Sequence, residues 1–391
     1  MGRVLPPLIG LLAAALAIAG VGGMAQADTN WTMRVRAVGD YLLAQQTAHG
    51  CIPDAPGGLR ANQDAAMAYA LVTFAHAYRV TSADRFRRGL RSGIEWLAAT
   101  VEKRERPWVG SWRHAYSAKP PYVALPTSPA ENVEDGRGGT ANAALFAYLV
   151  YLYGEVAPDR SFVLKMRPYV RAALDFLLER NLAENHLFYT GWYRIRGTGR
   201  WELYRMQVAT DQAAAYLGLR AGQRLLAHRR YGVAADRLAR EIDVLYHKES
   251  RAFAVARDPG GKLIPPADDC ESYLTQGYLA WVFGHQRETK DAIQWLQDRH
   301  APDGTFRRKR TDVPYIQPAL AFCLGARRLG LYPSDRGQIK RWLRTYALTP
   351  QHAIREALVP NPATPSHLTG WFTLAVLDAD PLPRRERDPT P

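Results

Sequence analysis

The sequence predicts an all-α fold, a toroid of six helical hairpins that carries short β-hairpins in its long loops. Two observations predict it. Two kinds of helix alternate along the chain, and the connections between them alternate between short and long. Because one hairpin cannot bury its apolar face alone, stacking six of them in a ring buries a continuous core.

The two kinds of helix differ in hydropathy. The segment 84–103 is amphipathic, because Phe86, Leu90 and Ile94 recur at helical spacing while arginines occupy the other face. The segment 140–156 is apolar nearly all round, which indicates burial on every side. We expect the amphipathic helices to form an outer ring and the apolar helices an inner ring.

Each predicted outer helix is followed by a predicted inner helix. The fifth inner helix is the least regular, because Pro314 fits its first turn and Pro318 is expected to kink it. The outer helices are expected to start near Trp31, Asp84, Asp159, Tyr231, Arg287 and Asp335, and the inner ones near Asp64, Thr140, Asp211, Glu271, Asp312 and His367.

Connections from inner to outer helices are short, as at 157–158, whereas those from outer to inner helices are long, as at 104–139. In a closed ring all long loops lie at one end, above the N-termini of the inner helices. Loops held by a rigid scaffold carry binding residues, so this end is the predicted working face. Two loops should form strand pairs, 186–204 around Gly197 to Gly199 and 253–263 around Pro259 to Gly261.

The two ends of the chain differ from the ring. Residues 1–27 have the order of a secretory signal, with Arg3, an apolar run over 8–21 and a small-residue site ending at Ala27. An uncleaved membrane anchor is the alternative. Cleavage leaves a toroid domain over 28–379 and a proline-rich charged tail over 380–391 that is expected to be disordered. The protein should then be secreted or periplasmic, without stable membrane insertion.

Charge and cysteine content restrict the partners. The net charge of +14 comes mostly from arginine, which reflects either codon composition or an acidic partner. Export argues against nucleic acid, so the acidic partner would be a uronate-containing or sulfated glycan. Cys51, Cys270 and Cys323 lack zinc-ligand spacing, and a bond between Cys51 and Cys270 is left open.

The architecture over residues 31–378 resembles the six-hairpin glycosidase-like superfamily, the (α/α)6 toroids. Three phrases are similar to that superfamily: TDQAAA at 210–215, CESYLTQGY at 270–278 and DGTF at 303–306. The superfamily includes unsaturated glucuronyl hydrolases, glucoamylases and several polysaccharide lyases. The resemblance implies a pocket at the ring opening and a carbohydrate substrate, and it carries over no catalytic residue.

Acidic residues stand where inner helices are expected to begin, and glycoside hydrolysis needs two carboxyl groups. Each is also a favoured N-cap, so the structural role competes with the catalytic one. The loop over 131–139 holds three carboxylates, Asn132 and several glycines. Asp135 with Asp211 is therefore our first choice of catalytic pair, and the reserves are Glu134, Glu271 and Asp64.

The long loops are rich in aromatic residues, which stack on sugar rings when exposed and otherwise pack the loops onto the ring. The run from Trp112 to Tyr116 adds a cation and a histidine, which suits an anionic sugar. His367 opens the last inner helix. The candidate substrate-binding residues are Trp108, Trp112, Arg113, His114, Tyr116, Asn132, Trp192, Trp201 and His367.

Three functions remain in competition. The leading hypothesis is a glycoside hydrolase acting on a polysaccharide or oligosaccharide. The first alternative is a polysaccharide lyase using Arg113, His114, Tyr116 and Asn132, and the second is a non-catalytic glycan-binding envelope protein. No metal, nucleotide or other cofactor is expected, because the sequence contains neither HExxH nor a glycine-rich phosphate loop, although an acidic pocket could hold calcium.

Overall fold

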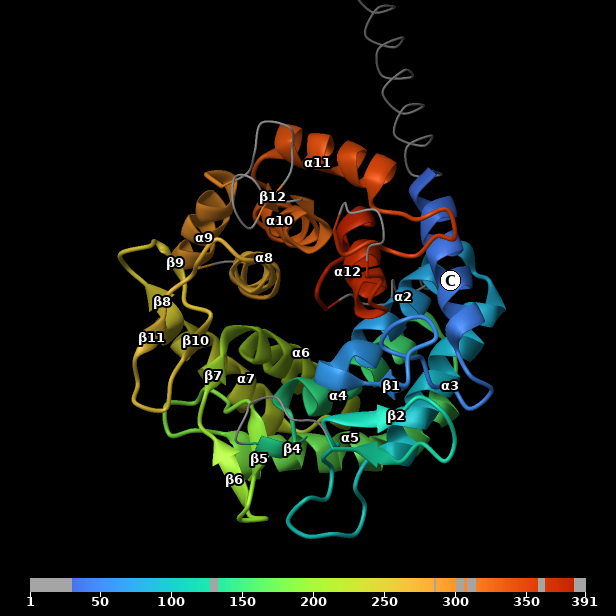
Figure 1. Cartoon of the computed structure of the whole chain (residues 1–391), viewed down its shortest axis with the longest axis vertical. Coiled ribbons are helices and arrows are strands. Elements are labelled where there is room, and N and C mark those ends of the chain that lie inside the picture. The colour runs from blue at the N-terminus through green and yellow to red at the C-terminus, as the bar shows by residue number, and fades with distance from the viewer. Residues whose placement is uncertain are drawn as a thin grey trace, which may run out of the picture.

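The computed structural model describes residues 30–126, 133–284, 286–299, 306–307, 314–357 and 363–382. Within these ranges, outer and inner helices alternate around a ring (Figure 1). The outer helices are residues 30–45, α3 (Asp84–Thr100), α5 (Arg160–Phe176), α7 (Arg229–Glu241), α9 (Arg287–Gln297) and α11 (Pro333–Tyr346). The inner helices are α2 (Ala66–Thr81), α4 (Thr140–Val156), α6 (Ala209–Leu226), α8 (Cys270–Phe283), α10 (Ile316–Leu329) and α12 (His367–Val376).

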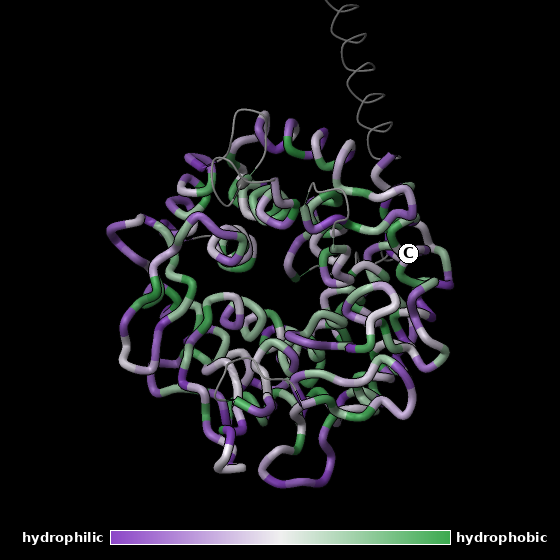
Figure 2. The backbone as a smooth tube through the Cα atoms, in the orientation of Figure 1, coloured by the Kyte–Doolittle hydropathy of each residue, from purple (hydrophilic) through white to green (hydrophobic). Residues whose placement is uncertain are grey.

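The predicted (α/α)6 toroid is confirmed, and its hydropathy explains it. Helix α3 buries Phe86, Leu90 and Ile94 on one face, as an outer helix should, and α4 buries nearly every side chain. One hydrophobic cluster runs through all six hairpins. Figure 2 shows that the inner helices are more hydrophobic than the outer helices and loops that surround them.

Small residues allow the inner helices to approach one another closely. A Cβ built on Gly370 of α12 would lie 1.9 Å from the carbonyl oxygen of Tyr69 in α2, where the last hairpin meets the first. A Cβ on Gly277 of α8 would lie 2.3 Å from the carbonyl oxygen of Ala321 in α10. Glycine is therefore needed at both crossings, since any side chain would push the backbones apart.

Short strands and single-turn helices order the long loops. Strands β5 (Gly191–Ile195) and β6 (Trp201–Tyr204) form the predicted pair, and β4 (Val133–Arg137) joins them in the order β4-β5-β6. The second predicted pair is β10 (Ala256–Arg257) with β11 (Leu263–Ile264), extended by β7 (Gln207–Val208). The remaining elements are β1 (Arg60–Ala61), β2 (Ala115–Ser117), β3 (Ala124–Leu125), β8 (Tyr246–His247), β9 (Ala252–Phe253), β12 (Phe306–Arg307), β13 (Pro314–Tyr315), η1 (Gln63–Ala65), η2 (Leu177–Asn181) and η3 (Ile242–Leu245).

The fifth inner helix differs from the prediction. It begins at Ile316, so Pro314 lies in β13 and Pro318 lies in the first turn. The expected kink is therefore wrong, because backbone N–H groups of a first turn have no intrahelical partner for proline to remove. Asp312, the predicted start, lies outside the described residues.

Other expectations meet the structure only in part. Cys51 and Cys270 are not joined by a disulfide, and Cys51 is a buried thiol whose pKa burial raises to about 12. The predicted signal over 1–27 and residues 383–391 of the predicted tail lie outside the described residues. Within the described part of the chain, no helix is both long and apolar enough to span a membrane.

Candidate functional site

A pocket of about 510 Å³ opens at the N-terminal end of the inner ring. All six inner helices contribute residues from their first two turns, so the prediction that these N-termini converge on one opening is confirmed. The long loops supply the rest of the wall, as expected for loops held by a rigid scaffold. The main polar and aromatic lining residues are Asp54, Asp64, Tyr69, His114, Asn142, Tyr193, Asp211, Glu271, His367 and Trp371.

Asp211 is the most perturbed carboxyl group of this pocket. It lies in the first turn of α6, where its side chain is largely shielded from water. Burial raises its pKa, the side chain of Thr190 opposes part of this rise, and the negative charges of Asp64 and Glu271 add to it, so that the pKa is about 7. At neutral pH about half of the molecules therefore carry a protonated Asp211, so this residue can serve as a general acid.

Asp64 and His114 face each other in the pocket wall. The Oδ1 atom of Asp64 lies 3.5 Å from Nε2 of His114, and the Asp64 side chain is 75% exposed. Asp64 adopts a left-handed backbone conformation in η1, with φ of 48°. Such a conformation costs free energy outside glycine and is found preferentially at functional sites. His114 is held by its backbone N–H, which donates to the carbonyl oxygen of Gly136 at 2.8 Å.

Glu271 and His367 complete the polar wall predicted from the inner-helix starts. Glu271, in the first turn of α8, is exposed to the pocket, and burial together with the Asp269 charge raises its pKa. His367 is the first residue of α12, and burial lowers its pKa to about 4 although the nearby Asp64 opposes the shift. His367 is therefore a neutral imidazole at neutral pH.

Asp54 is a carboxyl group in the pocket wall that was not predicted from the sequence. Its Oδ2 atom accepts a hydrogen bond from the Gln63 backbone N–H at 3.3 Å, while Oδ1 is buried without a partner among the described residues. Burial raises its pKa to about 6. It stands between Pro53 and Pro56 in a loop, a position that no periodic pattern singles out.

The aromatic residues that the inner helices contribute to the pocket, Tyr69 and Trp371, were not predicted from the sequence. Trp371 stacks on Tyr69 with ring centroids 5.2 Å apart, and Tyr278 meets the Trp371 ring edge-on at 4.7 Å. Tyr193 of β5 forms the side wall and packs against Tyr204 at 4.8 Å. On the inner helices these rings follow the apolar pattern of core residues, so hydropathy could not identify them as pocket lining.

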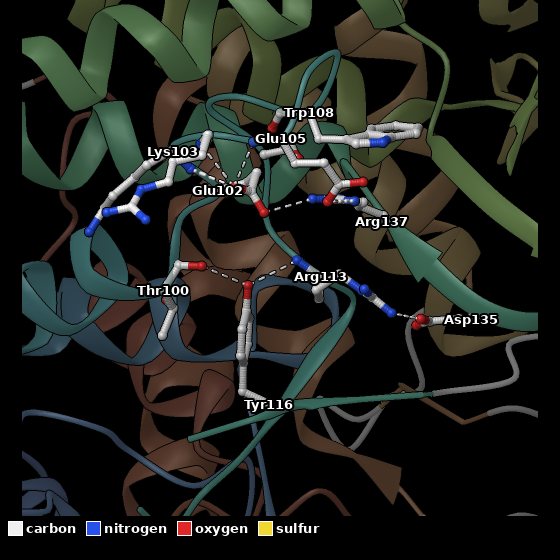
Figure 3. A network of polar contacts seen from close by, with 11 residues as sticks. Thr100, Glu102, Lys103, Glu105, Trp108, Arg113, Tyr116, Asp135 and Arg137 are labelled. Atoms are coloured by element: carbon white, nitrogen blue, oxygen red, sulfur yellow. Dashed lines mark hydrogen bonds and ion pairs between the residues drawn. The ribbon is translucent and has the colours of Figure 1, made fainter. Parts of the chain in front are cut away.

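The structure does not bring the first-choice catalytic pair, Asp135 and Asp211, together in the pocket. Asp135 is fully buried in β4, forms an ion pair with Arg113 and accepts the Gly136 backbone N–H, and it does not line the pocket (Figure 3). Glu134 is likewise outside the pocket, where it pairs with Arg194 at 3.0 Å. Successive residues of a strand point to opposite faces, and both faces of β4 here lie against arginines.

Most of the predicted substrate-binding aromatics pack the loops instead. The indole N–H of Trp112 donates to the Leu97 carbonyl oxygen at 2.9 Å, and the Tyr116 hydroxyl donates to the Thr100 carbonyl oxygen at 3.0 Å (Figure 3). Trp108 lies against Trp192 and Trp201 at 5.3 and 5.6 Å. These residues and Arg113 are not among those lining the pocket. Asn132 lies outside the described residues.

The Asp135 contacts predict a structural effect. We expect Asp135→Asn to lower the free energy of unfolding by about 1–2 kcal/mol, because the Arg113 guanidinium loses its buried counter-charge. Turnover should change by less than about threefold, since Asp135 does not reach the pocket. Urea unfolding monitored by tryptophan fluorescence measures the first effect. A loss of turnover without a loss of stability would contradict this structural role.

The described residues contain no group of three or more His, Cys, Asp and Glu side chains placed to hold a metal ion. The arrangement that they do contain is a proton-bearing carboxyl group, several further carboxyl groups, a neutral imidazole and an aromatic floor. It can donate a proton, accept one and stack on a ring-shaped ligand.

Comparison with known proteins identifies the architecture. No family model matches the chain, and no curated protein sequence matches it significantly. Among solved structures, a D-mannose isomerase matches with TM-score 0.65 and 10% identity, covering 90% of this chain and 97% of the other. A cellobiose 2-epimerase from Spirochaeta thermophila DSM 6192 matches with TM-score 0.63 and 12% identity, covering 87% and 92%.

An unsaturated glucuronyl hydrolase from Bacillus sp. GL1, responsible for the degradation of glycosaminoglycan, matches with TM-score 0.61 and 11% identity, covering 89% of this chain and 96% of the other. These matches extend over nearly the whole toroid. At such low sequence identity they show a shared fold and no shared function. The chain shares the (α/α)6-toroid fold of these structures.

Proposed function

We propose that this protein is a carbohydrate-active enzyme, a glycoside hydrolase that cleaves at the end of a polysaccharide or oligosaccharide. The observation that carries the proposal is the pKa of Asp211, raised to about 7 among other carboxyl groups in the pocket. Glycoside hydrolysis requires one carboxyl group that keeps its proton and one that has lost it. The solved structures of similar fold are carbohydrate-processing enzymes, which supports the substrate class.

In the proposed reaction, Asp211 protonates the oxygen of the leaving sugar. Asp64 is the proposed second carboxyl group, which activates water or attacks the anomeric carbon, because its side chain is exposed to the pocket and lies 3.5 Å from His114. Glu271 and Asp54 are the remaining carboxyl groups of the wall. The face formed by Trp371 and Tyr69 provides an apolar surface for the sugar ring.

The lyase alternative loses most of its predicted residues. The hydroxyl group of Tyr116 is engaged by backbone groups, and Arg113 is engaged by Asp135. His114 is the one residue of that set that lines the pocket within the described part of the chain. A lyase needs a base beside the uronate and a group that neutralises its carboxylate, so the described geometry favours hydrolysis.

One observation favours a second candidate function, sugar epimerisation or isomerisation. His367 is a neutral imidazole in the pocket wall, with a pKa lowered to about 4, and such a group can accept a proton from a sugar carbon at neutral pH. A D-mannose isomerase and a cellobiose 2-epimerase are among the structures that share the fold.

One assay distinguishes these functions. The purified protein is incubated in heavy water with a panel of neutral and uronate-containing oligosaccharides, and the products are separated by chromatography and mass spectrometry. We expect a released terminal sugar without new ultraviolet absorbance. Absorbance from a new carbon–carbon double bond would support the lyase, deuterium incorporation without cleavage would support the epimerase, and binding without turnover would support the glycan-binding protein.

We also propose that the protein is exported, on the basis of the signal-like residues 1–27. N-terminal sequencing of protein recovered outside the cytoplasm should begin at Asp28, after the small-residue site that ends at Ala27. An N-terminus at Met1 in the membrane fraction would support the anchor instead.

A further inference from the structure

Two hollows lie along the outer wall of the ring, one at each half of α5. The first has a volume of about 750 Å³ and is lined by Arg106, Arg167, Arg171 and Arg180 together with Leu164 and two prolines. The second has a volume of about 380 Å³ and is lined by Arg160, Arg167 and Arg224. Both include Leu164 and Arg167, so they form one track, the α5 groove.

The arginines of the α5 groove are the uncompensated charges of this surface. Arg106, Arg160 and Arg171 are exposed, and among the described residues none has a carboxylate within ion-pair distance. Six arginines and four acids line the groove, and arginines outside the groove pair with three of these acids: Arg91 with Asp159, and Arg230 with Asp175 and Glu179. The fourth acid is Glu155. The groove is therefore positively charged.

Helix α3 shows that this pattern is local. All of its arginines are ion-paired: Arg85 with Asp40, Arg87 and Arg88 with Asp84, and Arg91 with Glu95 and Asp159. A general excess of arginine in the sequence does not explain why the neighbouring outer helix α5 leaves its arginines without counter-charges. A groove in which arginines outnumber acids is suited to an anionic ligand.

The lining of the α5 groove favours a glycan over other polyanions. Its exposed apolar surface comes from Leu164, which is 46% exposed, and from Pro107 and Pro168, whereas the aromatic ring of Phe176 is buried. Single-stranded nucleic acids bind to exposed aromatic rings that stack on the bases. A concave groove also matches a linear chain better than a flat membrane surface. Carboxylates on a saccharide chain can meet the guanidinium groups while the sugar rings cover the aliphatic surface.

The groove is close to the pocket through strand β5. The Arg180 guanidinium, which lines the groove, lies over the Trp192 ring at 5.1 Å. The next residue, Tyr193, lines the pocket. Neighbouring residues of a strand point to opposite faces, so Trp192 contacts Arg180 of the groove on one face of β5 and Tyr193 lines the pocket on the other.

We propose that the α5 groove is a second binding site, which holds an internal stretch of an acidic, uronate-rich polysaccharide whose end enters the pocket. The assignment of that polymer as substrate depends on the proposed function, whereas its binding does not. Two sites on one chain raise the effective concentration of the chain end at the pocket, even when each site is weak.

The test compares two double variants with equal changes in charge. Arg106→Gln with Arg171→Gln removes two groove cations, and Arg341→Gln with Arg344→Gln removes two exposed cations from α11, on the opposite side of the ring (Figure 1). Affinity for polygalacturonate is measured by affinity electrophoresis at low and moderate salt, with dextran as the neutral polymer. An exposed ionic contact is worth about threefold in affinity, so the groove variant should bind about tenfold more weakly and the α11 variant less than about twofold.

Several results would overturn the proposal. If both variants bind polygalacturonate equally weakly, the net charge of the whole protein and not the groove attracts the polymer. If the groove variant binds as tightly as the parent, the groove is excluded as the binding site. Groove-dependent binding of single-stranded DNA or of phosphatidylglycerol vesicles that exceeds the binding of polygalacturonate would assign another partner. Activity on a short oligosaccharide reports the pocket separately, because the groove variant should keep it unchanged even where polymer binding is lost. If no hydrolysis is detected, the affinities of the two variants for polygalacturonate still test the groove.

Discussion

Replacing Asp211 by Asn should lower turnover by about a hundredfold or more, because the variant has no proton to give to the leaving sugar. Asn keeps the size and shape of the side chain. The loss should therefore appear in kcat, with a smaller change in KM. Asp135→Asn is the matched control, since it makes the same substitution outside the pocket.

The pH dependence of turnover tests the same assignment. Asp211 acts in its protonated form, and its pKa is about 7, so kcat/KM should fall about tenfold per pH unit above neutrality. The substitution that lowers turnover should not lower the free energy of unfolding at high pH. The folded pKa lies above the ordinary value of 3.8, so ionisation destabilises the folded protein as pH rises from about 4 through 7. The Asn variant should be at least as stable as the parent at pH 8.

These outcomes separate catalysis from folding. A variant that is inactive at pH 8 but resists urea at least as well as the parent supports Asp211 as the acid. An Asp211→Asn protein that retains parent turnover would refute the assignment and move attention to Glu271 and Asp54 in the same wall.

Replacing Gly370 by Ala should destabilise the protein by about 3 kcal/mol, at the upper end of the cost of overpacking. The new methyl group would lie 1.9 Å from the Tyr69 carbonyl oxygen and 2.8 Å from its carbonyl carbon, so α12 and α2 must move apart where the ring closes. Neither atom belongs to a flexible side chain that could turn away. Because Tyr69 and Trp371 stack beside this crossing, KM should rise as well.

Gly337→Ala in α11 is the matched control. The nearest atom to the added methyl group is Nη1 of Arg341 at 3.7 Å, an ordinary contact. Alanine favours the helix over glycine by about 0.8–1.0 kcal/mol, so this variant should be as stable as the parent or slightly more stable. Guanidinium unfolding measures both variants. A Gly370→Ala protein as stable as Gly337→Ala would show that α2 and α12 do not approach as closely as described.

The sequence by itself determined the ring and the location of its working face. Helical periodicity and the choice between one apolar face and an apolar circumference are local properties, readable in 84–103 and 140–156. Once the ring is inferred, the N-termini of the inner helices must converge, because alternating connections run up outside and down inside. Asp64, Asp211, Glu271 and His367 could therefore be placed in one pocket before any contact was known, and they line it.

Tertiary structure alone decided which loop residues reach that pocket. Asp135 and Glu134 lie in a loop with an acidic, glycine-rich sequence, but the pairing of β4 with β5 turns their side chains toward Arg113 and Arg194. Strand partners and strand faces depend on segments far apart in the chain, so no local pattern contains them. The loop tryptophans became packing residues for the same reason.

Burial and the shape of the cavity explain the pocket residues that the sequence did not predict. Tyr69 and Trp371 have the sequence context of core residues, and they line the pocket only because the ring leaves its axis open at their level. Asp54 shows no pattern at all, and its raised pKa arises from neighbours that folding brings around it. Sequence periodicity reports which side of an element is apolar, whereas desolvation, counter-charges and cavities are properties of several elements together, and only the folded ring defines them.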